Sequence, residues 1–109
     1  FKRIIEEDMG VELNISFVSV EFEVFGHVQG CGFTKHCRDM CVKRKIGGWV
    51  KNSKTGTIMG KMQGGKEAID EMINWLTNTG SPGCQIERCE FKNWLTLMRQ
   101  DYRDFAIRF

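Results

Sequence analysis

Ten residues near the start of the chain have the types and spacing to bind an anion through the backbone. Segment 25–34 reads FGHVQGCGFT and holds three glycines within seven residues, Gly26, Gly30 and Gly32. Glycine adopts backbone angles closed to other residues, so a loop of this kind that leads into a helix can direct unpaired N–H groups toward one point. Such backbone nests and helix N-termini attract anions, phosphate above all. The alternative is a tight glycine turn between two packed elements, which the spacing alone slightly favours.

The residues on either side predict a strand before this loop and a helix after it. Apolar and polar residues alternate over 17–26, the period of a half-buried strand. Apolar residues then recur at helical spacing from Phe33 to Cys41, which predicts a helix over 33–45 that ends before a glycine pair. The glycine spacing matches neither the P-loop, because no Gly-Lys-Ser/Thr follows, nor the dinucleotide-binding pattern.

The rest of the chain predicts a ferredoxin-like α+β sandwich. The predicted order is strand, helix, strand, strand, helix, strand, strand, which gives an antiparallel sheet with both helices on one face, plus a C-terminal strand. Residues 1–16 form a polar N-terminal extension, and 17–109 form the domain. The later predicted elements are strands over 49–53 and 57–63 around a hairpin turn, a helix that ends at Gly80, and strands over 85–94 and 105–109.

Length and charge limit the classes of function. A chain of 109 residues is one domain, and its net charge of +2 is too balanced to argue for nucleic acid or an anionic membrane as partner. No apolar run approaches the roughly 18 residues that a membrane span needs. We therefore expect neither nucleic acid nor a membrane among its partners, and we expect a monomer.

The chain contains five cysteines, an odd number without a dense framework. This composition favours a reducing compartment, where thiols act as small apolar residues, so we expect a cytoplasmic protein. A metal site at Cys37 and Cys41 with His36 is disfavoured, because His36 projects about 100° away from Cys37 on a helix. Cys31 lies in the glycine loop near a helix N-terminus, where thiol pKa values fall, so a reactive thiol there stays open.

Several motifs in the same order resemble those of acylphosphatases of the animal type. The resemblance covers roughly residues 17–109 and leaves only the N-terminal extension outside. The motifs are FGHVQGCGF at 25–33, GWVKN at 48–52, GT at 56–57, GSP at 80–82 and FAIRF at 105–109.

The resemblance implies a sheet order of 4-3-1-2-5 and hydrolysis of carboxyl-phosphate anhydrides without metal or cofactor. It also implies that Asn52 orients the attacking water. The expected ligand is a small acyl phosphate, or inorganic phosphate or sulfate. The residues that would bind the phosphate are His27, Val28, Gln29, Gly30, Cys31, Gly32 and Phe33.

The chain departs from the family pattern at Thr34, where the resemblance implies an arginine that clamps the phosphate. A hydroxyl lacks both the fixed charge and the two-pronged donor geometry of a guanidinium. Lys35 projects about 100° away on a helix, and His27 stands where relatives often have Arg. We therefore expect slowed hydrolysis, with a non-catalytic anion-binding or protein-interaction relative as the alternative. Nucleic-acid recognition on this fold is disfavoured, because the central strands lack stacking aromatics among basic residues.

Overall fold

A computed structural model describes residues 16–109, and the N-terminal extension up to residue 15 lies outside the described residues. All seven predicted elements are present close to the expected places, and the second predicted helix ends in a separate π-helical turn. No helix in the described range is long and apolar enough to cross a membrane. The elements are β1 (Phe17–His27), α1 (Phe33–Lys43), β2 (Gly47–Asn52), β3 (Ile58–Gly65), α2 (Lys66–Asn74), the π-helical turn η2 (Trp75–Thr79), β4 (Gln85–Leu97) and β5 (Phe105–Arg108).

The five strands form one sheet in the order β4-β1-β3-β2-β5. The order 4-3-1-2-5 that the family resemblance implied is therefore wrong in its centre. β1 lies between β4 and β3 and pairs antiparallel with both, whereas β3 joins β1 to β2. The C-terminal strand β5 extends the sheet by pairing parallel with β2.

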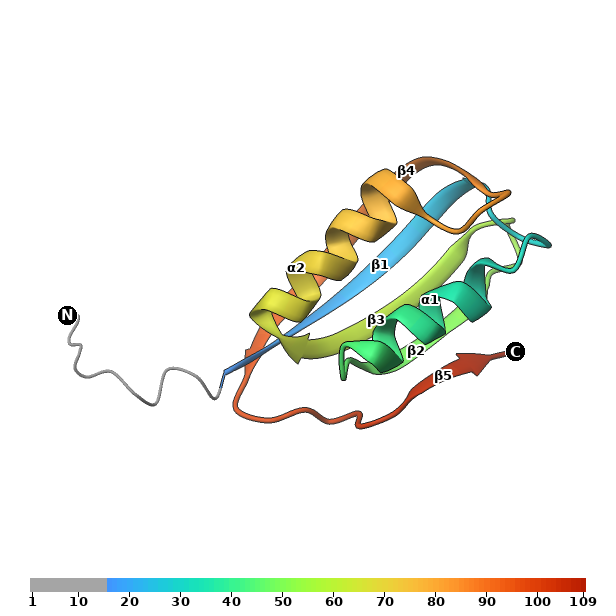
Figure 1. Cartoon of the computed structure of the whole chain (residues 1–109). Coiled ribbons are helices and arrows are strands. Elements are labelled where there is room, and N and C mark those ends of the chain that lie inside the picture. The colour runs from blue at the N-terminus through green and yellow to red at the C-terminus, as the bar shows by residue number, and fades with distance from the viewer. Residues whose placement is uncertain (1–15) are drawn as a thin grey trace.

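Both helices cover the same face of the sheet, as the α+β prediction required (Figure 1). The core forms between that face and the helices, because every second residue of β1 points toward them. Phe22 packs against Gly60 of β3, where a Cβ atom would come within 2.3 Å of the phenyl ring. The largest fully buried side chains are Phe33, Ile46, Ile58, Met62, Ile69, Met72, Leu76, Gln63, Val20, Val24, Val28 and Val50.

The end of the second helix differs from a regular α-helix. After Asn74 the chain continues through η2, and the N–H of Gly80 donates to the carbonyl of Trp75 at 2.8 Å. This bond spans five residues, as in a π-helix. Gly80 then leaves the helix with a φ of 67°, a value that favours glycine, so the predicted helix end at this residue is confirmed.

Three connections meet at one end of the sheet. In the antiparallel register, Val24 near the end of β1 faces Ile58 at the start of β3. His27 at the very end of β1 faces Gln85 at the start of β4. The β1–α1 loop, the β2–β3 turn and the segment before β4 therefore lie at the same edge, although they are far apart in the sequence.

Candidate functional site

The glycine loop occupies residues 28–32, between the last residue of β1 and the first of α1. Val28 and Phe33, at its two ends, are each about 1% exposed and anchor the loop in the core. Gly30 and Gly32 have φ values of 79° and 80°, in the left-handed region that glycine adopts without strain. Gly32 is also the N-cap of α1, so the loop turns directly into the helix.

The backbone N–H groups of this loop are available to a ligand. Among the hydrogen bonds of residues 16–109, none uses a backbone N–H of residues 28–32 as donor. The first turn of α1 contains no acidic side chain, and the first N–H groups of a helix have no partner within it. Free donors and a helix N-terminus together create a positive potential that suits an anion.

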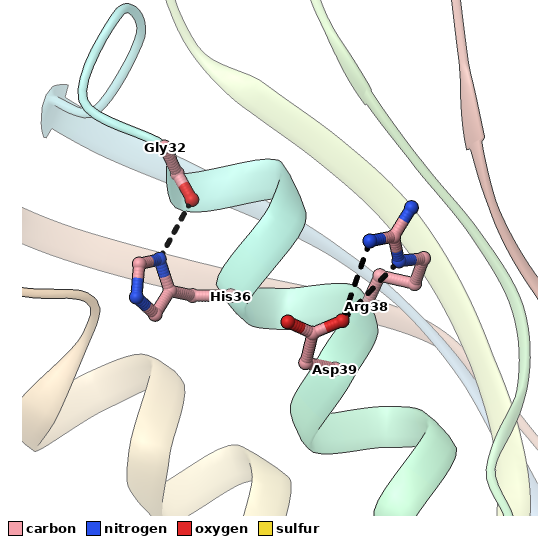
Figure 2. A network of polar contacts seen from close by, with 4 residues as sticks. All are labelled: Gly32, His36, Arg38 and Asp39. Atoms are coloured by element: carbon pink, nitrogen blue, oxygen red, sulfur yellow. Dashed lines mark hydrogen bonds and ion pairs between the residues drawn. The ribbon is translucent and has the colours of Figure 1, made fainter.

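His36 completes the first turn of α1 without entering the loop. Its backbone N–H donates to the carbonyl of Gly32 at 3.1 Å, and its Nδ1 donates to the same oxygen at 2.9 Å (Figure 2). The imidazole is exposed, whereas Cys37 and Cys41 are buried in the core. The structure therefore separates the residues weighed as metal ligands, and the core packing expected of both cysteines is confirmed.

Gln29 connects the loop to the β2–β3 turn. Its Nε2 donates to the backbone carbonyls of Ser53 at 2.9 Å and Thr57 at 2.8 Å. The turn itself is held by the N–H of Ser53, which donates to the Thr57 carbonyl at 2.8 Å. Thr57 Oγ1 in turn donates to Glu23 Oε2 on β1 at 2.7 Å. One glutamine side chain thus fixes the loop against a rigid turn.

Asn52 directly precedes the residue that Gln29 binds in this turn. It is the last residue of β2, it faces Ile58 across the sheet, and it immediately precedes Ser53. Its side chain is exposed and has no hydrogen bond within the part of the chain that the structure describes. The side chain of Asn52 is therefore not hydrogen-bonded to its own backbone, as asparagines before a turn often are.

Two residues of α1 bear on the charge near the loop. Thr34, the second residue of the helix, is half-buried, and it offers only a neutral hydroxyl. Arg38 follows one turn later on the same face, with its guanidinium 3.4 Å from the Asp39 carboxylate (Figure 2). His27, at the end of β1, is exposed.

Cys31 and Cys84 form a disulfide with a Cα–Cα distance of 5.7 Å. This corrects the interpretation of all five cysteines as thiols and of Cys31 as a free reactive thiol. The pairing joins the glycine loop to the segment before β4, two of the three connections that meet at this end of the sheet. Cys37, Cys41 and Cys89 remain free.

Two of the free thiols, those of Cys37 and Cys89, are poor nucleophiles. A hydrogen bond with Cys41 and burial raise the pKa of Cys37 well above its ordinary value. Burial, with a smaller contribution from the neighbouring Glu90 carboxylate, raises the pKa of Cys89 to about 12. Neither thiol is ionised at neutral pH, and the thiolate is the reactive form.

A hollow of about 240 Å³ lies at the other end of the sheet, near Val18, α2 and the last residues of β4. Its walls are largely apolar, with Trp94 and Leu95 among them. It contains neither Asn52 nor any residue of the glycine loop. Backbone anion binding needs convergent N–H donors more than a deep cavity, so the loop is the stronger candidate site.

Three features of this end of the sheet were not predicted from the sequence: the bridge made by Gln29, the place of Arg38 one turn after Thr34, and the disulfide partner of Cys31. Gln29 was assigned only as a loop member, and its bridge to the β2–β3 turn depends on tertiary contacts. Arg38 carries the helical i+4 spacing from Thr34, a signal that was present in the sequence. Cys84 could have been placed near Cys31 from topology, because both precede elements that start at the same end of the sheet.

Comparison with known proteins agrees with this arrangement. The acylphosphatase family model matches residues 20–107. Acylphosphatase-2 of Mus musculus is 44% identical over 91 residues, which cover 84% of this chain and 86% of that protein. Acylphosphatase-2 of Homo sapiens is 40% identical over 94 residues, covering 86% and 95%.

Solved structures show the same likeness in three dimensions. The acylphosphatase from Bacillus subtilis superposes with a TM-score of 0.75 at 26% identity, covering 84% of this chain and 99% of that one. The acylphosphatase from Coxiella burnetii superposes with a TM-score of 0.73 at 28% identity, covering 85% and 94%. Sequence, fold and the order of the motifs agree, and the chain belongs to the acylphosphatase family.

Proposed function

We propose that the protein hydrolyses small acyl phosphates, with the phosphate held by the backbone N–H groups of residues 27–33. The observation that carries this proposal is a glycine loop with uncommitted N–H donors at a helix N-terminus, tied by Gln29 beside Asn52. Membership of the acylphosphatase family supports the reaction class. The donors suit the three negatively charged oxygens of a phosphoryl group.

Hydrolysis of an acyl phosphate depends on the positioning of water and phosphate more than on a strong base. Water attacks phosphorus in line, the bond from phosphorus to the water oxygen forms, and the bond to the carboxylate oxygen breaks. A carboxylate is a good leaving group, so charge neutralisation and orientation dominate catalysis. The amide of Asn52 is the group that we assign to orienting the water, because Asn52 directly precedes the turn that Gln29 holds and its side chain has no hydrogen bond among residues 16–109.

Thr34 limits the rate that this site reaches. Loss of one preorganised donor to a developing charge costs about 10²–10³ in rate, and a charged bidentate group belongs at the upper end. The half-buried hydroxyl of Thr34 can supply one neutral hydrogen bond and no charge. We infer an enzyme whose chemical step is slowed while its backbone site for phosphate is retained.

Arg38 is the cation best placed to supply part of the missing charge. It lies one helical turn after Thr34 on the same face of α1, and helical side chains lean toward the N-terminus, here toward the loop. Its side chain is 38% exposed, and its ion pair with Asp39, at 3.4 Å, is long and solvated. The guanidinium can therefore leave this pair for a stronger, doubly charged phosphate partner at little cost.

The second candidate is a non-catalytic anion-binding or protein-interaction relative on the same scaffold. The replacement of the expected arginine by Thr34 is the feature that favours it. The two candidates differ in turnover. Both predict that inorganic phosphate or sulfate raises the melting temperature if an anion is the ligand, but only the enzyme releases phosphate from an acyl phosphate.

The test is a steady-state assay of phosphate release from a simple aromatic acyl phosphate. The enzyme predicts release above the uncatalysed background, and a large gain in the Thr34→Arg variant. Asn52→Ala, made in both backgrounds, should remove the catalysed rate. Release at the background rate in every variant, together with thermal protection by phosphate, would favour the non-catalytic candidate.

Partners and location complete the proposal. We infer a monomer with a small-molecule ligand, and no role for nucleic acid or a membrane surface. The cytoplasmic expectation rested on five free thiols, and the Cys31–Cys84 disulfide removes two of them from that argument. Disulfides in a reducing compartment are generally transient and redox-sensing. If the protein is cytoplasmic, the Cys31–Cys84 disulfide is therefore regulatory.

A further inference from the structure

The Cys31–Cys84 disulfide joins the glycine loop to the well-packed segment before β4. Cys84 precedes β4 directly, and its backbone N–H donates to the carbonyl of Ser81 at 3.2 Å. Ser81 is only 3% exposed, and its Oγ lies 2.8 Å from Cys84 Sγ. The disulfide therefore restrains the position of Cys31 in the loop relative to this packed segment.

The loop has two lateral tethers, one on each side of Gly30. Gln29 bonds to the β2–β3 turn through two hydrogen bonds, and Cys31 bonds to Cys84 through sulfur. Gly30 between them is exposed, and within residues 16–109 no atom apart from those of Gly30 and its chain neighbours lies within 4 Å of the place where its Cβ would stand. Because the space at the Cβ position of Gly30 is open, the two tethers restrain this middle part of the loop, while Val28 and Phe33 anchor its ends.

The two cysteines are also within reach of solvent. Both are half-buried, whereas Cys37 and Cys41 are fully buried. Cys89 is held protonated by its raised pKa, at about 12. Cys89 is half-buried as well, but it is protonated and therefore unreactive, so the disulfide is the half-buried group that is open to thiol exchange.

We propose that the Cys31–Cys84 disulfide is a thiol-exchange site that takes a dithiol reductant, and that its redox state sets the affinity of the loop for phosphate. The proposal rests on the proposed function of the loop as an anion site. With the disulfide closed, the N–H groups are held ready for the anion. With the disulfide open, the loop keeps Gln29 as its lateral tether, more of the loop must be ordered when the anion binds, and the net affinity for phosphate falls.

The exchange balances without a further reactant. A thiolate of the dithiol attacks Cys84 Sγ, the sulfur–sulfur bond breaks, and Cys31 leaves as a thiolate that takes a proton from solvent. Cys31 is the better leaving group because it lies just before a helix N-terminus, which stabilises negative charge. The second thiol of the reductant then attacks the mixed disulfide and releases Cys84 as a thiol. The protein disulfide gains two electrons and two protons, and the dithiol becomes a disulfide.

The experiment compares the oxidised chain with the chain reduced by dithiothreitol. Thiol counting under native conditions should show two additional reactive thiols after reduction. Inorganic phosphate is then titrated against the melting temperature of each form. We expect half-maximal protection of the reduced form to require about tenfold more phosphate, the loss expected when one further loop residue must be ordered on binding.

Two variants separate this effect from a general loss of structure. Cys84→Ser, which removes the tether permanently, should bind phosphate as the reduced chain does and should not respond to dithiothreitol. Cys89→Ser, which removes a free thiol away from the loop, should respond as the native chain does. Circular dichroism on each form confirms that the fold is retained before phosphate is added.

The outcomes distinguish this inference from the function on which it rests. Equal phosphate affinity before and after a verified release of two thiols overturns the inference and leaves the anion site intact. Absence of phosphate protection in both forms overturns the proposed anion site, and this inference falls with it. A weaker affinity confined to the reduced chain and to Cys84→Ser supports both.

Discussion

Reduction of the Cys31–Cys84 disulfide is expected to lower the free energy of unfolding by about 4 kcal/mol. The two cysteines are 53 residues apart in the sequence, and closing a loop of that length removes about 14 cal/mol/K of entropy from the unfolded chain, which is about 4 kcal/mol at 25 °C. In a domain of this size each kcal/mol corresponds to roughly 4–8 °C in melting temperature. The reduced protein should therefore melt at least about 15 °C lower than the oxidised protein.

Urea unfolding of the oxidised and reduced chains measures this difference directly. The Cys31→Ser/Cys84→Ser double variant should match the reduced chain, and Cys89→Ser should match the native chain in both states. A mass spectrum that shows two additional hydrogens after reduction verifies that the bond has opened. Equal unfolding free energies for verified oxidised and reduced chains would refute the argument, because the entropy of a constrained unfolded state does not depend on details of the site.

Three further predictions concern the loop, its charge and the free thiols. Gln29→Ala should lower the free energy of unfolding by about 1–3 kcal/mol and should weaken the thermal protection given by phosphate. Gln100→Ala is the matched control, because Gln100 also bridges two backbone carbonyls, each at 3.0 Å. It should cost similar stability and leave phosphate binding unchanged. Arg38→Gln should lower kcat/KM for an aromatic acyl phosphate by about tenfold or more, and adding Thr34→Arg to that variant should restore kcat/KM. Lys35→Gln, which makes the same charge change on another face of α1, should have little effect on kcat/KM. The pKa of Cys89 is raised to about 12 in the folded chain, so the unfolded chain loses this proton at a lower pH. The free energy of unfolding, measured with urea, should therefore fall as the pH rises above about 9. It should fall less steeply in Cys89→Ser.

The sequence predicts the elements well because burial leaves a periodic pattern. Alternation over 17–26 marks β1, and the helical spacing of Ile69, Met72 and Leu76 marks α2 with its continuation η2. Periodicity reports which face of an element is buried, but it does not report which strand lies beside it. The place of β1 between β4 and β3, with β3 at the centre of the sheet, therefore appears only in the pairing register.

The candidate site was predictable only in part for the same reason. Glycine positions at Gly30 and Gly32 signal the left-handed backbone that the loop adopts, so the loop could be located from its residues. The bridge from Gln29 and the disulfide at Cys31 depend on the approach of segments more than 20 residues apart. Composition was misleading here, because an odd number of cysteines favours free thiols on average and does not exclude one pair.

The central claim is that the backbone loop retains acyl phosphate chemistry although Thr34 stands where an arginine is expected. Its most direct test is kcat/KM for phosphate release from one aromatic acyl phosphate, measured side by side for the native chain and for Thr34→Arg. We predict a native rate above the uncatalysed background and an increase of about 10²–10³ in the variant. Background rates in both proteins would contradict the account, and so would a native rate equal to that of the variant.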